Sequence, residues 1–213
     1  MLTREQLQSA AANSGFPIDS LEKVWMLVRL LDMMVAHPFM GPRVALKGGT
    51  ALNLFVFDVP RLSVDIDVNY VGAADRATMT VERPKLDAAL KQVASRLGLA
   101  VKRAPSEHAG GKWRLSYKSA LGRPAILEVD VNYMLRVPLW PPTLREPREF
   151  LGDRARQIQV LDDHELAFLD RLNGKGDIEA SLLTADADLR QRIAANPGLR
   201  WKALNVKKHV GGD

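Results

Sequence analysis

The chain has 213 residues, of which 46% are hydrophobic and 26% charged, a composition typical of a folded domain rather than a disordered chain. Its net charge of +5 is compatible with binding a polyanion such as RNA or a nucleoside triphosphate. The absence of cysteine excludes a disulfide framework, a thiol nucleophile and a thiolate zinc site. No signal pattern opens the chain and no apolar run approaches the roughly 18–20 residues that span a bilayer, so we expect a cytoplasmic protein with no membrane partner.

Two helices are expected before residue 40. The capping-box pattern of Thr3 and Gln6 predicts a short helix that ends near Asn13. A second helix is expected from about residue 20 to Ala36, because apolar side chains recur there at spacings of three and four. The proline after His37 ends this helix, since proline has no N–H and disfavours a helical residue before it.

The most informative stretch runs from residue 46 to residue 70. It begins with a glycine pair and a hydroxyl ahead of a short apolar segment: Gly48, Gly49 and Thr50. Four polar side chains then occupy alternate positions: Arg61, Ser63, Asp65 and Asp67. If this second part is a strand, its period of two places these four side chains on one face and apolar residues on the other.

This pattern has the chemistry of a metal–triphosphate site. Two carboxylates on one strand face lie about 6–7 Å apart along the backbone, and at about 4 Å they repel by roughly 4 kcal/mol at an effective dielectric of about 20. An enclosed pair therefore holds a cation or raises a pKa, and hard oxygen ligands suit Mg²⁺ or Mn²⁺. The glycine turn adds backbone N–H groups, a hydroxyl and the start of a helix near Thr50, all of which suit a phosphate. Taken singly, the first motif could be an ordinary turn and the second a solvated strand face.

Downstream, a helix is expected over residues 76–97, followed by antiparallel strands. The alternating segment 112–119 and the returning strand 125–133 would be joined by a hairpin turn at Leu121-Gly122. Gly110-Gly111 predicts another turn before them. Strands that run in both directions make the predicted sheet a mixed one.

The returning strand adds further acidic side chains. Glu128 and Asp130 share one face of it with Ile126 and Asn132. A transfer reaction that uses two metal ions needs a third carboxylate to help position them, and this strand could supply it. Solvated strand residues are the alternative interpretation.

The combination of these motifs resembles the nucleotidyltransferases of the DNA polymerase β superfamily, and within them the AbiEii/MenT group of toxin-like enzymes. Lys47 to Leu52 matches that group's Lys-Gly-Gly-Thr-x-Leu stretch, and Arg61 to Asp67 matches its Arg-x-Ser-x-Asp-x-Asp element. The resemblance implies an α+β fold in which helices flank a mixed β-sheet. It also implies a nucleotidyltransferase core with N-terminal helices at residues 1–167 and a helical C-terminal segment at residues 168–213.

The same resemblance implies roles for individual residues. The catalytic and metal-holding residues would be Asp65, Asp67 and Asp130, with Glu128 as a further metal ligand. The nucleotide-binding residues would be Lys47, Gly48, Gly49, Thr50, Arg61 and Ser63. The implied reaction is Mg²⁺- or Mn²⁺-dependent transfer of a nucleotide from an NTP to an acceptor, for which the 3′ end of tRNA or another RNA is a candidate. Related toxins are paired with an antitoxin protein, so a cognate antitoxin in a bacterial cell is an expected partner.

One part of the family pattern is missing. The family normally follows a Glu-Leu opening with a helix that carries a lysine and then with an Arg-Asp-x-x-Asp element, but here residues 165–167 lead directly into Phe168. Lys175 lies between two glycines, which predicts a loop, so the lysine's role is not transferred to it. The resemblance resumes from Phe168 to Val210. We therefore expect an internal deletion near Ala167–Phe168, whether natural or engineered, or a long loop left out of the chain.

The missing lysine has a chemical consequence, because the loss of one preorganised donor can cost about 2.7–4 kcal/mol in rate. The alternative function is therefore a catalytically impaired remnant that binds nucleotide or RNA, or that regulates an intact enzyme. A kinase-like phosphotransferase with the same metal geometry is a third possibility.

The C-terminal tail combines basic and apolar side chains. Four basic residues, Arg200, Lys202, Lys207 and Lys208, surround Trp201 and Leu204. Basic residues around an aromatic ring could bind RNA. We expect instead a solvated helix that docks through Trp201 and Leu204.

Overall fold

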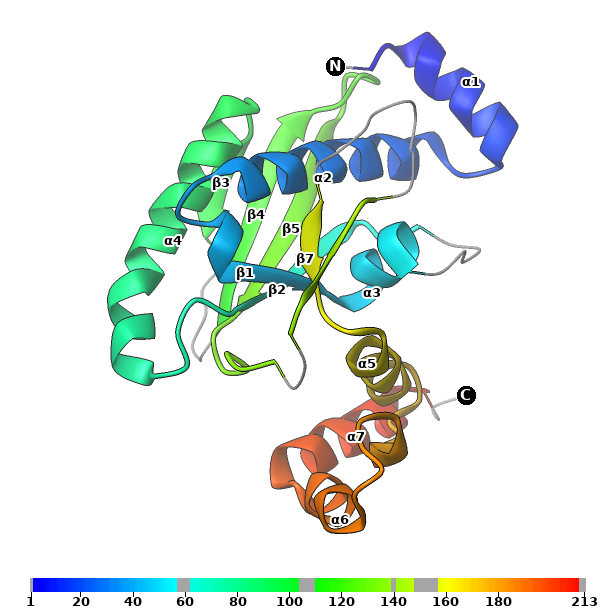
Figure 1. The fold of residues 1–213 in the computed structure, drawn as a ribbon. Coiled ribbons are helices and arrows are strands. Elements are labelled where there is room, and N and C mark those ends of the chain that lie inside the picture. Colours follow the sequence, from blue (N-terminus) through cyan, green and yellow to red (C-terminus); the bar gives the residue numbers. More distant parts are fainter. Residues whose placement is uncertain (1, 57–61, 104–109, 139–140, 148–156, 211–213) are drawn as a thin grey trace. The chain divides into compact units, whose positions relative to one another are not determined.

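The structure is a computed structural model that describes residues 2–56, 62–103, 110–138, 141–147 and 157–210 (Figure 1). The chain divides into two compact units, Met1–Val160 and Leu161–Asp213. No helix among the described residues has both the length and the apolarity of a membrane span.

A mixed β-sheet forms the centre of the first unit. The described residues contribute seven strands: β1 (Val44–Lys47), β2 (Asp65–Tyr70), β3 (Ala100–Arg103), β4 (Gly110–Lys118), β5 (Pro124–Asn132), β6 (Thr143–Arg145) and β7 (Ile158–Val160). Their order in the sheet is β3-β4-β5-β2-β1-β7-β6. β2 is parallel to β5 and β1 is parallel to β7, whereas the other neighbours are antiparallel. This arrangement confirms the predicted α+β fold with a mixed sheet.

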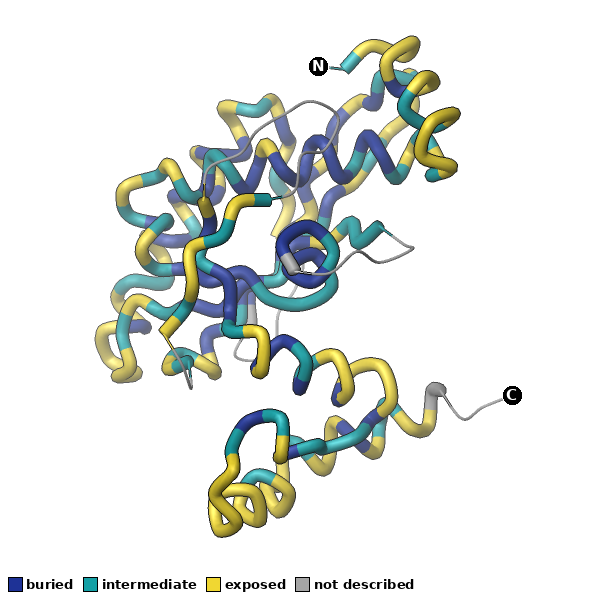
Figure 2. Tube along the Cα trace, turned by 45° about the vertical axis from the view of Figure 1, so that its right-hand side comes forward, coloured by how far each residue is buried: buried dark blue, intermediate teal, exposed yellow. Residues whose placement is uncertain are grey.

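The longer helices of this unit are α1 (Arg4–Ser14), α2 (Ile18–Ala36) and α4 (Arg76–Arg96). The predicted capping box is present in α1, where the Gln6 N–H donates to Thr3 Oγ1 at 3.2 Å and the Thr3 N–H donates to Gln6 Oε1 at 2.8 Å. α2 buries a broad apolar stripe, as Figure 2 shows, and ends before His37 as predicted. Both N-terminal helices therefore follow from local sequence signals.

α2 and α4 cover one face of the sheet. Along β5, Leu127, Val129 and Val131 are buried, whereas the residues that alternate with them are more accessible. α4 reaches the buried face at Trp113, the cross-strand neighbour of Val129, where the Lys91 ammonium lies 5.7 Å from the centre of the Trp113 ring. The opposite face of β5 therefore carries its acidic side chains.

The connection between β1 and β2 is helical. After a 3₁₀ turn, η1 (Gly41–Arg43), β1 leads directly into α3 (Gly48–Ala51), which continues as the π-helical stretch η2 (Leu52–Val56). β2 then returns antiparallel to β1. The glycine turn and the acidic strand are thus brought back against each other.

β2 is shorter than predicted. It begins at Asp65, because its pairing with β5 starts there, opposite Glu128, and residues 62–64 have no regular structure. The predicted common strand face is therefore correct for Asp65 and Asp67 but wrong for Ser63. Arg61 lies outside the described residues.

The predicted turn before β4 is also wrong. Gly110 and Gly111 belong to β4 and pair with Asn132 and Val131, because β5 is long enough to pair with β4 over its whole length. The turn at Leu121-Gly122 between β4 and β5 is confirmed.

The second unit is helical and contains α5 (Asp163–Lys175), η3 (Ala180–Leu182), α6 (Ala187–Ala195) and α7 (Pro197–Val210). α5 crosses Ala167–Phe168 without interruption and includes Lys175 in its last turn, so the predicted loop at Lys175 is wrong. Gly176 ends α5 with a φ of 68°, and a Cβ atom there would lie 2.5 Å from the Ala203 carbonyl oxygen. This glycine lets the end of α5 approach α7 closely.

α7 packs through a different face from the one predicted. Trp201 and Leu204 are 68% and 61% exposed, whereas Ala203 is only 7% exposed. The expectation that this helix docks through Trp201 and Leu204 is therefore wrong. The small Ala203 side is the one that fits against the end of α5.

Candidate active site

Four charged residues line up across four adjacent strands on the face of the sheet opposite α4. Lys47 of β1 pairs with Asp67 of β2, Asp67 pairs with Asp130 of β5, and Asp130 pairs with Lys112 of β4. Residues that face each other across neighbouring strands have Cβ atoms only about 4.5–5.5 Å apart. We call these four residues the charged row. The sheet register thus places two neighbouring carboxylates between two lysines.

A second set of charges lies two residues away on the same face. Asp65 pairs with Glu128, and Glu128 pairs with Arg114. Lys112 Nζ lies 2.6 Å from Glu128 Oε2, and Arg114 Nε lies 3.0 Å from Glu128 Oε1. The hydrogen bond from Lys112 is the main cause that lowers the pKa of Glu128. Both of its carboxylate oxygens are engaged by cations, so Glu128 anchors Lys112 here, and its expected role as a further metal ligand stays a prediction.

Asp67 is the electrostatic centre of the row. Burial is the main cause that raises the pKa of its carboxyl group; the neighbouring charges of Asp130 and Asp65 raise it further, and Lys47 opposes them. In the described part of the chain, no hydrogen bond or ion pair engages the side chains of these three aspartates. The row therefore sets two like charges, Asp67 and Asp130, side by side, and its own cations are the lysines at its two ends.

Sequence reasoning did not single out Lys112 as a site residue. In the structure its pKa is raised, first by the hydrogen bond to Glu128 and also by the charges of Asp130 and Asp65. The predicted hairpin could have revealed Lys112. If the two strands are paired symmetrically about Leu121, Lys112 lies opposite Asp130, as it does in the structure. Its position opposite an aspartate of the row makes it a second cation for an anionic ligand.

The two glycines of the turn leave room for Asp67 and Ser63. Gly48 has a φ of 74°, and a Cβ atom on it would lie 2.6 Å from Asp67 Oδ2. A Cβ atom on Gly49 would lie 3.0 Å from Ser63 Oγ. The turn thus packs its backbone directly against these two polar side chains, an approach that a residue with a Cβ atom would block.

Thr50 joins the turn to the acidic strand from inside the protein. Its side chain is fully buried, and its hydroxyl donates to the backbone carbonyl oxygen of Asp65. Thr50 Oγ1 also lies 3.0 Å from Ser63 Oγ. A carbonyl oxygen can only accept, so the single Thr50 proton is used inside the protein. In the structure Thr50 therefore braces Ser63 and Asp65, and its expected contact with the triphosphate stays a prediction.

The donor set suits a hard divalent cation, since three carboxylates lie on two adjacent strands and one of them has a raised pKa. As placed, no three acidic or histidine side chains within the described ranges converge closely enough to enclose a metal ion. Asp65, Asp67 and Asp130 are the residues that could hold one, and Glu128, whose two oxygens contact Lys112 and Arg114, is a further candidate. The residues present therefore fit a metal that draws these three carboxylates together.

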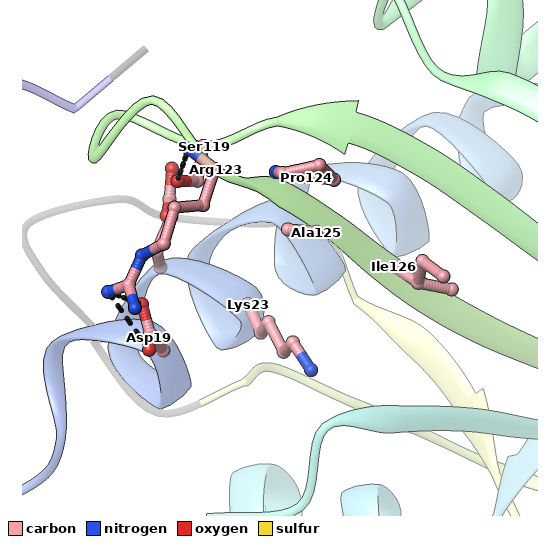
Figure 3. A pocket seen from close by; sticks show the side chains of 8 residues that line it. Asp19, Lys23, Ser119, Arg123, Pro124, Ala125 and Ile126 are labelled. Carbon is pink, nitrogen blue, oxygen red and sulfur yellow. Dashed lines mark hydrogen bonds and ion pairs between the residues drawn. The ribbon is translucent and has the colours of Figure 1, made fainter.

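A separate cavity of about 340 Å³ lies at the start of β5, before the residues that pair with β2. Figure 3 shows Lys23 of α2 and Ile126 of β5 on its wall, and Arg123 reaching Asp19 at 3.4 Å. None of the aspartates of the site lines this cavity. It is therefore distinct from the charged row.

Comparisons with known proteins agree with this geometry. The family model described as nucleotidyl transferase AbiEii toxin of type IV toxin–antitoxin systems matches residues 29–168, which is more than half of the chain. No curated protein matches. Among solved structures, the fold resembles that of MenT4, a nucleotidyltransferase toxin from Mycobacterium tuberculosis H37Rv, with a TM-score of 0.57, 20% identity, and coverage of 91% of this chain and 69% of that one. At that identity the likeness concerns the fold alone, whereas the family match includes both motifs and all four strands of the charged row. The chain therefore belongs to the AbiEii family of nucleotidyl transferase toxins of type IV toxin–antitoxin systems.

Proposed function

We propose that this protein transfers a nucleotide from an NTP to the hydroxyl of an RNA acceptor, such as the 3′ end of tRNA, in a reaction that depends on Mg²⁺ or Mn²⁺. The observation that carries the proposal is the charged row, in which Asp67 and Asp130 lie side by side between Lys47 and Lys112. Two neighbouring carboxylates that repel each other suit a site that binds a cation, and the lysines beside them suit an anionic substrate.

Each group has a role in this reaction. The acceptor hydroxyl loses its proton to water and its oxygen forms a bond to the α-phosphorus. The bond from the α-phosphorus to the oxygen shared with the β-phosphate breaks, and pyrophosphate leaves with that oxygen. Asp65, Asp67 and Asp130 would hold the divalent cation, which supplies charge stabilisation and polarises the acceptor hydroxyl. The N–H groups of Gly48 and Gly49 would orient the triphosphate.

The lysines at the two ends of the row would offset the triphosphate charge. Lys47 acts from β1, and Lys112 acts from β4, where Glu128 holds its ammonium group at 2.6 Å. The Thr50 proton goes to the Asp65 carbonyl, so Ser63 donates its own proton to Thr50 Oγ1 in the structure and would have to turn this hydroxyl to donate to the triphosphate. Lys112 thus offers a second cation for the triphosphate, from the strand next to Asp130.

Incubation of the protein with labelled NTPs, Mg²⁺ or Mn²⁺ and total tRNA tests this proposal. The parent protein should label RNA, and Asp65→Asn should reduce the labelling by roughly 100-fold or more, because an essential charge is removed without a change of shape. Asp188→Asn, at an exposed position in α6, is the matched control and should leave labelling unchanged.

Three results would contradict the proposal. Labelling by Asp65→Asn at the parent's rate would mean that Asp65 is not part of the site. NTP binding without any transfer would indicate a catalytically impaired remnant. A product that carries phosphate instead of a nucleotide would indicate a phosphotransferase.

We also propose that a cognate antitoxin protein is the partner of this chain, because the family to which the chain belongs consists of toxins of toxin–antitoxin systems. Co-expression with the product of an adjacent gene should relieve any growth defect that the parent protein causes. Relief of the same defect by Asp65→Asn alone would link the toxicity to the proposed transfer.

A further inference from the structure

α7 has two apolar faces, and only one of them is packed. The packed face is marked by Ala203, which is 7% exposed, whereas Trp201 and Leu204 are 68% and 61% exposed. Residues at i, i+3 and i+7 share one side of a helix, so Trp201, Leu204 and Lys208 form a single stripe opposite Ala203. We call these three residues the outer stripe. A large aromatic ring at this exposure contributes little to the packing of its own unit.

The charge of α7 is entirely positive. Its sequence contains four lysine or arginine residues and neither aspartate nor glutamate: Arg200, Lys202, Lys207 and Lys208. Lys207 is paired with Asp177 at 3.1 Å. Within the described ranges, Arg200, Lys202 and Lys208 form no ion pair. Three uncompensated cations therefore flank or join the outer stripe.

A flat aromatic ring among uncompensated cations is complementary to a single-stranded nucleic acid. The indole ring offers a surface on which a base can stack, and the cations are placed to contact phosphates on either side. A protein partner that covered Trp201 and Leu204 would instead have to supply acidic groups for Arg200, Lys202 and Lys208. The density of positive charge on a helix with no acidic residue favours the polyanion.

We propose that the outer stripe of α7, together with Arg200 and Lys202, binds a single-stranded segment of RNA. This inference rests on the proposed function and deepens it, because it assigns the binding of the RNA acceptor to α7 and the transfer reaction to the charged row. RNA binding by α7 does not depend on NTP or metal, so it can be measured whether or not transfer occurs.

Fluorescence anisotropy with a short labelled uridine oligonucleotide, in the absence of NTP and metal, tests the stacking role. Trp201→Ala should weaken binding roughly 5- to 150-fold, because stacking on an aromatic side chain is lost. Trp201→Phe should retain most of the affinity, and Trp201→Leu should lose as much as Trp201→Ala. Val81→Ala in α4 removes an apolar side chain that is 62% exposed and should have no effect.

Salt dependence tests the role of the cations. The slope of the logarithm of the association constant against the logarithm of the salt concentration should fall in magnitude by about 0.7 for each phosphate contact removed from a single strand. Lys202→Gln should show this change. Lys85→Gln, an exposed lysine on α4, is the matched control and should keep the parent's slope.

The outcomes separate this inference from the proposed function. Asp65→Asn should abolish transfer and retain the parent's affinity for the oligonucleotide. Unchanged affinity in both Trp201→Ala and Lys202→Gln would overturn the inference, even if transfer is observed. Full binding by Trp201→Leu, or dissociation of a dimer by Trp201→Ala in sedimentation experiments, would also overturn it and assign the stripe to a protein contact. Circular dichroism of each variant would establish that α7 still folds.

Discussion

The two ends of β2 differ in whether their polar side chains have hydrogen-bond partners. At its far end Tyr70 is fully buried, and its hydroxyl donates to Glu82 Oε2 at 2.6 Å. Arg43 holds the same carboxylate with two hydrogen bonds of 2.9 and 3.1 Å. At its start, Asp65 and Asp67 face further carboxylates, and their side chains receive no hydrogen bond from the described residues. β2 therefore has a cluster of paired side chains at one end and carboxylates without such partners among the described residues at the other.

The pKa shifts follow the same division. Hydrogen bonds from Arg43 and Tyr70 lower the pKa of Glu82, and burial together with Glu82 raises the pKa of Tyr70 to about 12. Burial and neighbouring carboxylates raise the pKa of Asp67. The comparison indicates that the far end of β2 stabilises the fold, whereas the ionised Asp67 carboxylate at its start destabilises it.

Removal of Arg43 should have the largest effect on stability. Arg43→Met leaves the Glu82 carboxylate and the Tyr70 hydroxyl without their cation, so the free energy of unfolding should fall by about 1–3 kcal/mol. Arg123→Met is the control, because Arg123 and Asp19 are 66% and 60% exposed and a surface pair contributes only about 0–1 kcal/mol. Urea unfolding measures both variants, and equal losses would refute the distinction between the two clusters.

Gly48→Ala should affect both stability and transfer. The left-handed backbone costs about 1–2 kcal/mol for a residue with a Cβ atom, and that atom would displace Asp67 Oδ2. Gly98→Ala is a matched control, since its φ is 71° and a Cβ atom there would meet nothing within 4 Å. Urea unfolding and the labelling assay should show similar stability losses in the two variants but a loss of transfer only in Gly48→Ala. Full transfer by Gly48→Ala would contradict the proposed role of the turn.

Lys112→Met should reduce the rate of transfer by about tenfold, because one cation beside the triphosphate is lost. This corresponds to a loss of roughly 1.4 kcal/mol of transition-state stabilisation. Steady-state kinetics with varied NTP concentration would measure the change. Lys112→Arg should restore part of the rate, since it keeps the charge. Lys118→Met removes an exposed lysine from the same face of β4 and should be neutral. A rate for Lys112→Met equal to that of Lys118→Met would exclude Lys112 from the site.

Asp67→Asn should have the smallest effect on stability, with the opposite sign to that of Arg43→Met. The raised pKa means that the ionised carboxylate destabilises the fold, so the variant should melt a few degrees higher at neutral pH. This gain is complete above the raised pKa and disappears as the pH falls to the ordinary value of 3.8, where the group is protonated in both states.

The lowered pKa of Glu82 predicts the reverse for Glu82→Gln. That variant should melt lower than the parent above the ordinary value of 4.5, and the loss should disappear as the pH falls through the lowered pKa. Thermal unfolding at several pH values compares the two variants. Shifts of the same sign would contradict the contrast between the ends of β2.

Sequence periodicity was sufficient to place Asp65, Asp67 and Asp130 on strand faces, because side chains alternate along any strand. It could not order the strands, so the alignment of Lys47 with Asp67 and of Asp67 with Asp130 became visible only in the fold. The start of β2 was missed for the same reason, since pairing partners decide where a strand begins.

The role of Thr50 and the orientation of α7 depend on tertiary contacts. A glycine turn followed by a hydroxyl suits a phosphate equally well whether the hydroxyl points outward or, as here, towards the Asp65 carbonyl. In α7, helical spacing gives one apolar face at Ala203 and another at Trp201, and only the packing of the unit decides which is covered.

A structure with Mn²⁺ and a non-hydrolysable NTP tests the central claim most directly. We predict Mn²⁺ bound by Asp65, Asp67 and Asp130, with the triphosphate against Gly48 and Gly49 and with Lys112 within reach of its oxygens. A nucleotide bound elsewhere, with no metal between Asp65 and Asp67, would contradict the claim that the charged row is the site of transfer.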